Sequence, residues 1–170
     1  MKEEKNEKWV HFVLAAVFII FLGSGLSACS HQKPAAAPPE QSKPTLYERL
    51  GGINNIALVV DDVIERSYVD PIFSANPYVH EAHKRFPKAV YKFNATALAC
   101  QAMGGPQKYT GRTLKEAHQH LHITEKEWDA LIAIFRDSMN GFKVPQREQS
   151  EVIAILESSK GQVISAASEQ

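Results

Sequence analysis

A repeated helix-start signal constrains this chain more than any other feature of its sequence. The pattern Thr-x-x-Glu occurs at Thr45, Thr113 and Thr124, and residues at helical spacing follow it. In this pattern, known as a capping box, the threonine and glutamate side chains each accept a hydrogen bond from the other residue's backbone N–H. Each pair thereby satisfies donors that the start of a helix leaves free. We therefore expect a helix to begin at each of these three places.

Glycine and proline mark the ends of the expected helices. Gly51-Gly52 and Gly104-Gly105 end the helices that precede them. Asp70-Pro71 and Asn76-Pro77 break the chain between two longer helices. Helices are expected over residues 53–68 and 89–103, over a short segment that carries His118, over a long segment from Thr124 to Gly141, and from Pro145 onward.

Length and charge limit the number of domains and the kinds of partner. The chain has 170 residues, 44% of them hydrophobic, and its formal net charge is zero. Low-complexity sequence is concentrated in the first 44 residues, so one domain of about 125 residues is expected after them. A neutral charge balance gives no electrostatic reason to expect nucleic acid as a partner.

Three histidines alternate along one short segment: His118, His120 and His122. His118 lies one helical turn after Leu114 and about one turn before Leu121, so its ring is expected on an apolar face. His118 and His122 also have the spacing at which two imidazoles on a helix chelate one metal ion. Spacing alone leaves three interpretations open: an axial haem ligand, a chelating pair, or an ordinary helix end where histidines favour the helix dipole.

Three motifs connect the chain to a known family. TLYERLGG covers residues 45–52, GGPQKYTGR covers 104–112, and AHQHLHI covers 117–123. Together and in this order they resemble group I truncated haemoglobins, over about the last three quarters of the chain. The resemblance implies an all-α truncated globin, a two-on-two helical sandwich around haem b, over residues 45–170. It also implies that His118 is the proximal ligand of the iron.

The resemblance also implies a set of pocket residues. Phe73 corresponds to a phenylalanine that packs on the haem, and Phe86 is its rival because the segment from Phe73 to Gly104 is longer than is usual in the family. Arg112 is expected to pair with a haem propionate. Because the sequence contains no Cys-x-x-Cys-His, the haem is expected to bind non-covalently. The expected cofactor-binding residues are His118, Leu114, Phe73, Arg112, Tyr91, Ala95, Leu98 and Ile123.

The ligand-facing side of the expected pocket departs from the family. Typical members place a tyrosine on the second helix and a glutamine on the distal helix, and both groups hydrogen-bond dioxygen. Ile64 and Ala95 stand at these positions, and neither side chain donates a hydrogen bond. Tyr91 is expected to supply a phenol from another position. His80 and His83 are expected at the surface.

The resemblance implies a haemoprotein that binds O2, NO or CO opposite His118. The polarity of the pocket then decides between oxygen storage, nitric oxide dioxygenation, peroxidase-like chemistry and sensing. The redox reactions among these require a reductant, which the sequence does not identify. The alternative hypothesis is a haem-free envelope lipoprotein that binds a transition metal through His118, His120 and His122. A third is a structural lipoprotein on a degenerate globin fold.

Residues 1–28 have the layout of an export signal. Lysines precede the apolar run 10–22, which is short for a membrane span and is followed by small residues. The sequence Leu26-Ser27-Ala28-Cys29 resembles a bacterial lipobox, and this implies that Cys29 is lipidated and becomes the mature N-terminus. A plain signal anchor is the alternative, because glutamates dilute the positive charge at the start.

Residues 29–44 are expected to tether the domain to a membrane. After Cys29 they contain four prolines and three consecutive alanines with no apolar period, a composition typical of an extended linker. Several acyl chains on Cys29 would exceed the two signals that stable anchoring requires. We therefore expect an exported lipoprotein of the cell envelope that faces the periplasm. Ser30, in place of an aspartate, favours the outer membrane.

Overall fold

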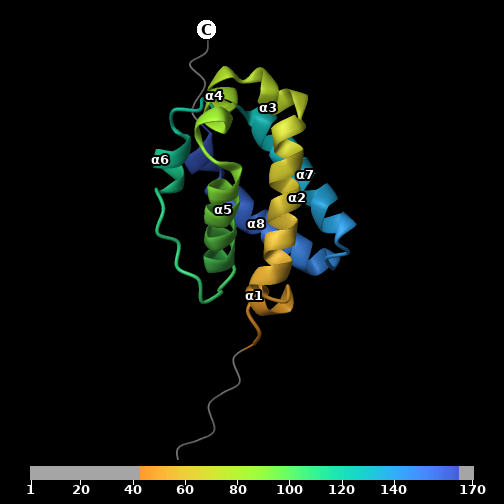
Figure 1. Ribbon diagram of the computed structural model, residues 1–170. Helices are drawn as coiled ribbons and strands as arrows, with labels where there is room; N and C mark the ends of the chain where they lie inside the picture. Colours follow the sequence, from red (N-terminus) through yellow and green to blue (C-terminus); the bar gives the residue numbers. More distant parts are fainter. Residues whose placement is uncertain (1–42, 165–170) are drawn as a thin grey trace, which may run out of the picture. The chain divides into compact units, whose positions relative to one another are not determined.

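The computed structural model describes residues 43–164, and this part of the chain is entirely helical, as the sequence predicts (Figure 1). Its helices are α1 (Leu46–Arg49), α2 (Ile53–Val69), α3 (Pro71–Ala75), α4 (Pro77–Arg85), α5 (Lys88–Ala102), α6 (Leu114–His118), α7 (Glu125–Gly141) and α8 (Gln146–Val163). None of the helices described is long and apolar enough to cross a bilayer.

The chain divides into two units, and the second, residues 41–170, is compact. All described residues belong to the second unit, which holds its own hydrophobic core and is therefore expected to fold alone. The predicted signal peptide, the lipidation of Cys29 and nearly all of the tether lie outside the described residues, so these assignments stay predictions.

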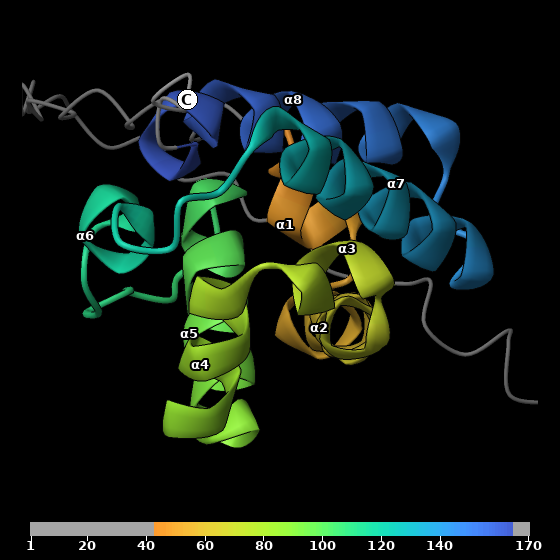
Figure 2. The same ribbon diagram turned by 90° about the horizontal axis from the view of Figure 1, so that it is seen from above.

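Two pairs of long helices form the frame of the second unit. Helix α2 packs against both α5 and α7, and α7 packs against α8. Seen from above, α7 and α8 form one layer, and α2 and α5 lie in the other (Figure 2). The short α6 lies beside this frame and contacts α8. The fold is therefore a two-on-two arrangement of helices.

The three predicted capping boxes are all formed. Each threonine hydroxyl accepts a hydrogen bond from the glutamate N–H, and each glutamate carboxylate accepts one from the threonine N–H. The distances from the threonine nitrogen to the carboxylate are 2.8, 2.9 and 2.7 Å at Thr45, Thr113 and Thr124. These local signals fix the starts of α1, α6 and α7, as expected.

The segment after α2 differs from the sequence prediction, because the two Pro breaks each start a short helix. Pro71 and Pro77 occupy first-turn positions of α3 and α4, where a missing N–H costs nothing. Asp70 caps α3 by accepting from Ile72 N–H at 2.7 Å, and Asn76 caps α4 in the same way. An Asx-Pro pair therefore begins a helix here as well as ending the one before it.

A buried carboxylate joins the α3–α4 corner to the start of α7. Glu127 is only 4% exposed, and its carboxylate accepts hydrogen bonds from the Asn76 amide at 2.6 Å and from Thr124. The same Asn76 amide donates to the Leu121 carbonyl at 3.0 Å, while its oxygen accepts from Tyr78 N–H. Asn76 therefore satisfies several buried groups at once.

Helix α7 ends in a left-handed residue that is not glycine. Lys143 has φ of 57°, and Val144 N–H donates to the Met139 carbonyl at 2.9 Å in a Schellman-type turn. Glycine normally occupies this position, since a side chain in the left-handed region costs about 1–2 kcal/mol. Lys143 is therefore expected to make the fold less stable than glycine at this position would.

Removing the Asn76 amide should destabilise the fold. Asn76→Ala leaves Glu127, the Leu121 carbonyl and two helix N–H groups without this partner, so we expect a loss of about 1–3 kcal/mol in the free energy of unfolding. Urea unfolding of residues 41–170 measures this free energy. Asn54→Ala, at an exposed position of α2, is the control. A change under about 0.5 kcal/mol for Asn76→Ala would show that this network is dispensable.

Replacing Lys143 with glycine should stabilise the fold. The substitution relieves left-handed strain but adds backbone freedom to the unfolded chain, so we expect a net gain of up to about 1 kcal/mol. Thermal unfolding of residues 41–170 measures it. Lys126→Gly, within the right-handed first turn of α7, should instead cost about 1 kcal/mol. Destabilisation by Lys143→Gly would contradict the strain argument.

Candidate functional site

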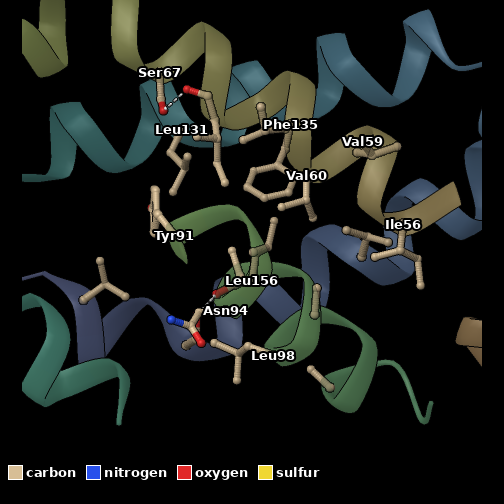
Figure 3. A pocket seen from close by; sticks show the side chains of 18 of the residues that line it. Ile56, Val59, Val60, Ser67, Tyr91, Asn94, Leu98, Leu131, Phe135 and Leu156 are labelled. Atoms are coloured by element: carbon tan, nitrogen blue, oxygen red, sulfur yellow. Dashed lines mark hydrogen bonds between the residues drawn. The ribbon is translucent and has the colours of Figure 1, made fainter. Parts of the chain in front are cut away.

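A cavity of about 950 Å³ lies among the helices of the described region. Side chains from α2, α5, α6, α7 and α8 line it, and most of them are apolar (Figure 3). Its volume is at the upper end of the range of small-molecule sites, which is roughly 300–1,000 Å³. The fold therefore contains a site large enough for an organic cofactor.

All eight residues expected from the sequence to bind a cofactor line this one cavity. They come from α3, α5 and α6 and from the loops that flank α6: Phe73, Tyr91, Ala95, Leu98, Arg112, Leu114, His118 and Ile123. Residues as far apart in the sequence as Phe73 and Ile123, fifty positions, thus line one cavity. Their roles toward a cofactor remain predictions.

His118 is held in one tautomer by the helix that carries it. Its Nδ1 lies 2.7 Å from the Leu114 carbonyl oxygen, which can only accept a hydrogen bond. Nδ1 therefore carries the proton, and Nε2 keeps its lone pair. Burial lowers the pKa of the His118 imidazole. The hydrogen bond to the Leu114 carbonyl opposes this shift, and the positive charges of His120 and Arg112 add to it, so the net direction is downward. The ring is thus neutral at pH 7 and able to ligate a metal.

The other two histidines do not join His118. Helix α6 ends at His118, so His122 is not on the same helix face as the sequence spacing suggested. His122 has φ of 51° and its ring lies 4.3 Å from that of Tyr78, while His120 is exposed. Between residues 43 and 164, no group of three or more His, Cys, Asp or Glu side chains is arranged to hold a metal ion. The three-histidine metal site therefore gains no support.

The cavity wall on α2 and α5 carries few hydrogen-bond donors. Ile64 and Ala95 both line it and present only carbon, whereas the Ser67 hydroxyl donates to the Ile64 carbonyl at 2.9 Å (Figure 3). Two polar side chains of α5, Tyr91 and Asn94, are labelled across the view from Ser67. Tyr68 on α2 lines the cavity as well. The available donors on these two helices are therefore the phenols of Tyr68 and Tyr91 and the Asn94 amide.

Tyr91 lines the cavity, and 42% of its surface is exposed. Desolvation raises the pKa of its phenol, and the neighbouring Tyr68 acts in the same direction. The exposure and the desolvation agree because Tyr91 lines the cavity, so its free surface faces the enclosed space. The phenol therefore stays protonated and able to donate.

His83 lies at this cavity and not simply at the surface as expected. Its ring stacks on Tyr68, with 3.7 Å between centroids and 8° between planes, and burial lowers the pKa of its imidazole. Lys88 places its ammonium 4.4 Å from the Tyr68 ring centre. The sequence did not reveal this because α4, which carries His83, was not predicted. His80 is exposed, as expected.

The Tyr-Thr-Gly-Arg turn positions Arg112 at the cavity. Tyr109 donates its hydroxyl proton to the Arg112 carbonyl at 2.7 Å and so holds the turn in place. Gly111 is required here because a Cβ would lie 2.3 Å from the Tyr109 hydroxyl oxygen. The Arg112 guanidinium lies 5.6 Å from the Phe86 ring centre. Phe86 and Phe73 both line the cavity, but Phe73 is buried and Phe86 half exposed.

A second cavity of about 480 Å³ adjoins this turn and is rich in positive charge. Arg85, Arg112 and His120 line it together with aromatic side chains. Its one acidic residue, Glu81, is paired with Lys84 at 2.9 Å. An anionic group at this mouth would therefore be stabilised.

Curated relatives share the sequence of this unit at low identity. The chain is similar to a group 1 truncated hemoglobin of a Synechocystis species, with 29% identity over 115 residues, 65% of this chain and 88% of the relative. It is similar to another from Mycolicibacterium paratuberculosis, with 27% identity over 112 residues, 66% of this chain and 78% of the relative.

Solved structures share the fold. Truncated hemoglobin from Tetrahymena pyriformis, in an Fe(III) form, superposes with a TM-score of 0.64 at 21% identity, over 72% of this chain and 99% of that one. The 2/2 hemoglobin of a Synechococcus species, with covalently attached heme, superposes with a TM-score of 0.61 at 24% identity, over 70% of this chain and 95% of that one. The model of the bacterial-like globin family matches residues 45–165. The chain therefore belongs to the bacterial-like globin family and has the truncated two-on-two globin fold.

Proposed function

We propose that the cavity binds haem b, with His118 as the proximal iron ligand, and that the protein binds a diatomic molecule on the other side of the haem. The observation that carries this proposal is the hydrogen bond from His118 Nδ1 to the Leu114 carbonyl, which leaves the Nε2 lone pair for a metal inside an apolar cavity. When bound, haem supplies an open iron coordination position for O2, NO or CO, and the redox chemistry of iron.

The residues that line the cavity fit a large flat cofactor with two carboxylates. Phe73, Leu98, Leu114 and Ile123 offer apolar surface, and Arg112 offers a guanidinium at the adjoining cationic cavity. No Cys-x-x-Cys-His motif is present in the sequence, so binding is proposed to be non-covalent. Apolar surface and an accessible cation are the two features that such a cofactor requires.

Tyr91 is proposed to donate a hydrogen bond to the diatomic ligand. Ile64 and Ala95 supply no donor, and the Ser67 hydroxyl is engaged with a backbone carbonyl. The Tyr91 phenol faces the apolar cavity, where a hydrogen bond is electrostatically stronger than in water. A single donor holds a polar ligand less firmly than the tyrosine and glutamine of typical family members do. The site therefore favours ligand binding with rapid release.

The chain is further proposed to act outside the cytoplasm. Support comes from the sequence of residues 1–28, which has the layout of a signal peptide, and from the lipobox-like Leu26-Ser27-Ala28-Cys29. Lipidation of Cys29 and the Pro-rich stretch before Thr45 would hold the globin near the periplasmic face of a membrane, with the outer membrane favoured. A reductant there would be needed for redox turnover.

The proximal role of His118 predicts a single essential histidine. Residues 41–170 mixed with haem should give a sharp Soret band that shifts when dithionite and CO are added, and His118→Ala should lose or alter that band. His120→Ala and His122→Ala, measured in parallel, should behave as the parent does. Equal effects of all three substitutions, or no haem retention by the parent, would contradict the proposal.

The proposed donor role of Tyr91 predicts faster ligand release in its absence. Tyr91→Phe removes only the hydroxyl, so the O2 dissociation rate measured by flow mixing should rise about fivefold to tenfold, the equivalent of about 1–1.4 kcal/mol. Dissociation of CO, a weaker hydrogen-bond acceptor, should change much less. Tyr78→Phe, at an exposed tyrosine, is the matched control. An unchanged O2 rate would exclude Tyr91 as the donor.

A further inference from the structure

Helix α4 is a discrete piece of the cavity wall. An extended residue separates it from its neighbours at each end, Asn76 before it and Phe86 after it, and a proline follows each of them. Among the described helices, α3 is the one that α4 packs closely against. Ala82, His83 and Phe86, in the second half of α4, line the cavity. A short helix therefore closes part of the cavity with little support from the four long helices.

The two halves of α4 are held in different ways. At the start, the Asn76 amide donates to the buried Glu127 carboxylate at 2.6 Å, and Val79 packs in the core. In the second half, the His83 ring stacks on the ring of Tyr68 on α2, with 3.7 Å between centroids and 8° between planes. The first half is thus anchored by a hydrogen bond and apolar packing, whereas stacked rings join the second half to α2.

The Tyr68 ring already faces one positive charge. The Lys88 ammonium lies 4.4 Å from its centre and is also paired with Glu65 at 2.8 Å. A protonated His83 ring would place a second cation on the same tyrosine. The cation–π attraction of one tyrosine ring is small, and the repulsion between the two cations works against it. The stack therefore suits a neutral His83 better than a charged one.

Two carboxylates lie in the surroundings of His83, and both are already paired. Glu65 on α2 is paired with Lys88 and Lys92, and Glu81 on α4 is paired with Lys84. The other ionisable groups around this part of the cavity are cations or neutral rings: His80 and Arg85 on α4, Tyr91 on α5, and Arg112 in the turn before α6. A proton on His83 therefore meets surroundings that do not neutralise its charge.

The direction of the pH effect follows from this environment. Burial lowers the pKa of the His83 imidazole, and the positive charges of His80 and Lys88 act in the same direction. An imidazole that moves into water regains its ordinary pKa of about 6.5. The open arrangement therefore binds the proton more tightly than the stacked one. The stacked arrangement has its full stability above the ordinary pKa and loses stability as the pH falls below it.

We propose that residues 82–86 form a lid on the cavity, which the stacking of His83 on Tyr68 holds closed and which opens when His83 takes up a proton. The Asn76 end of α4 stays in place, and the second half moves away from Tyr68 into water. Exchange of molecules between the cavity and the solvent then becomes faster in mild acid. The lid does not rest on the proposed haem binding, because all of its parts belong to the chain itself.

Hydrogen exchange of haem-free residues 41–170, followed by NMR between about pH 7.5 and pH 5, tests the lid. The protection factors of the amides of residues 82–86 should fall severalfold as the pH drops, while those in the middle of α7 should stay constant. His83→Phe keeps a ring on Tyr68 that takes up no proton, so its protection factors should not depend on pH. His80→Asn, at the exposed histidine of the same helix, should keep the response. A fall under about twofold in the parent, or an equal fall in His83→Phe, would overturn the proposal.

The rate of haem loss tests the consequence for the cavity. Transfer of haem from the loaded protein to an excess of apomyoglobin should be faster in mild acid, and His83→Phe should weaken this response to pH. Tyr68→Leu removes the stack and should speed transfer at neutral pH as well. Equal acceleration by acid in the parent and in His83→Phe would show that α4 does not control exit from the cavity. A chain that binds no haem would contradict the proposed function alone, because hydrogen exchange tests the lid without haem.

Discussion

The hydrogen bond between His118 Nδ1 and the Leu114 carbonyl is the interaction on which the proposed site depends. It is local, since donor and acceptor are one helical turn apart, yet it sets the tautomer of a ring that lines a large apolar cavity. The capping box at Thr113 starts the short helix that contains both residues, and α8 packs against that helix. A five-residue helix is too short to be stable alone, so tertiary packing must hold it.

The two-layer frame leaves a cavity where a solid core would otherwise form. Side chains around an empty space lose dispersion contacts, so the cavity lowers the stability of the protein without a ligand. Any molecule that binds only the folded state stabilises it, by an amount that grows with the logarithm of the ratio of its concentration to its Kd. Haem bound in the cavity would act in this way. Binding and folding are therefore coupled in this protein.

Sequence predicted the elements whose signals are local. Capping boxes predicted the starts of α1, α6 and α7, and apolar periodicity predicted α2. The first residue of α2, Ile53, is nevertheless 40% exposed. The pattern did not show that Asp70-Pro71 and Asn76-Pro77 begin helices, and so it missed α4 and the placement of His83. The cavity that His118 lines depends on how α2, α5, α7 and α8 pack. No local pattern encodes such long-range arrangements.

The most direct test of the central claim is the crystal structure of residues 41–170 grown with haem. It should show iron bound to Nε2 of His118, with Nδ1 still within hydrogen-bond distance of the Leu114 carbonyl and the propionates toward Arg112. Tyr91 should lie on the opposite side of the haem plane. Iron bound by a different side chain, or haem located outside this cavity, would contradict the account.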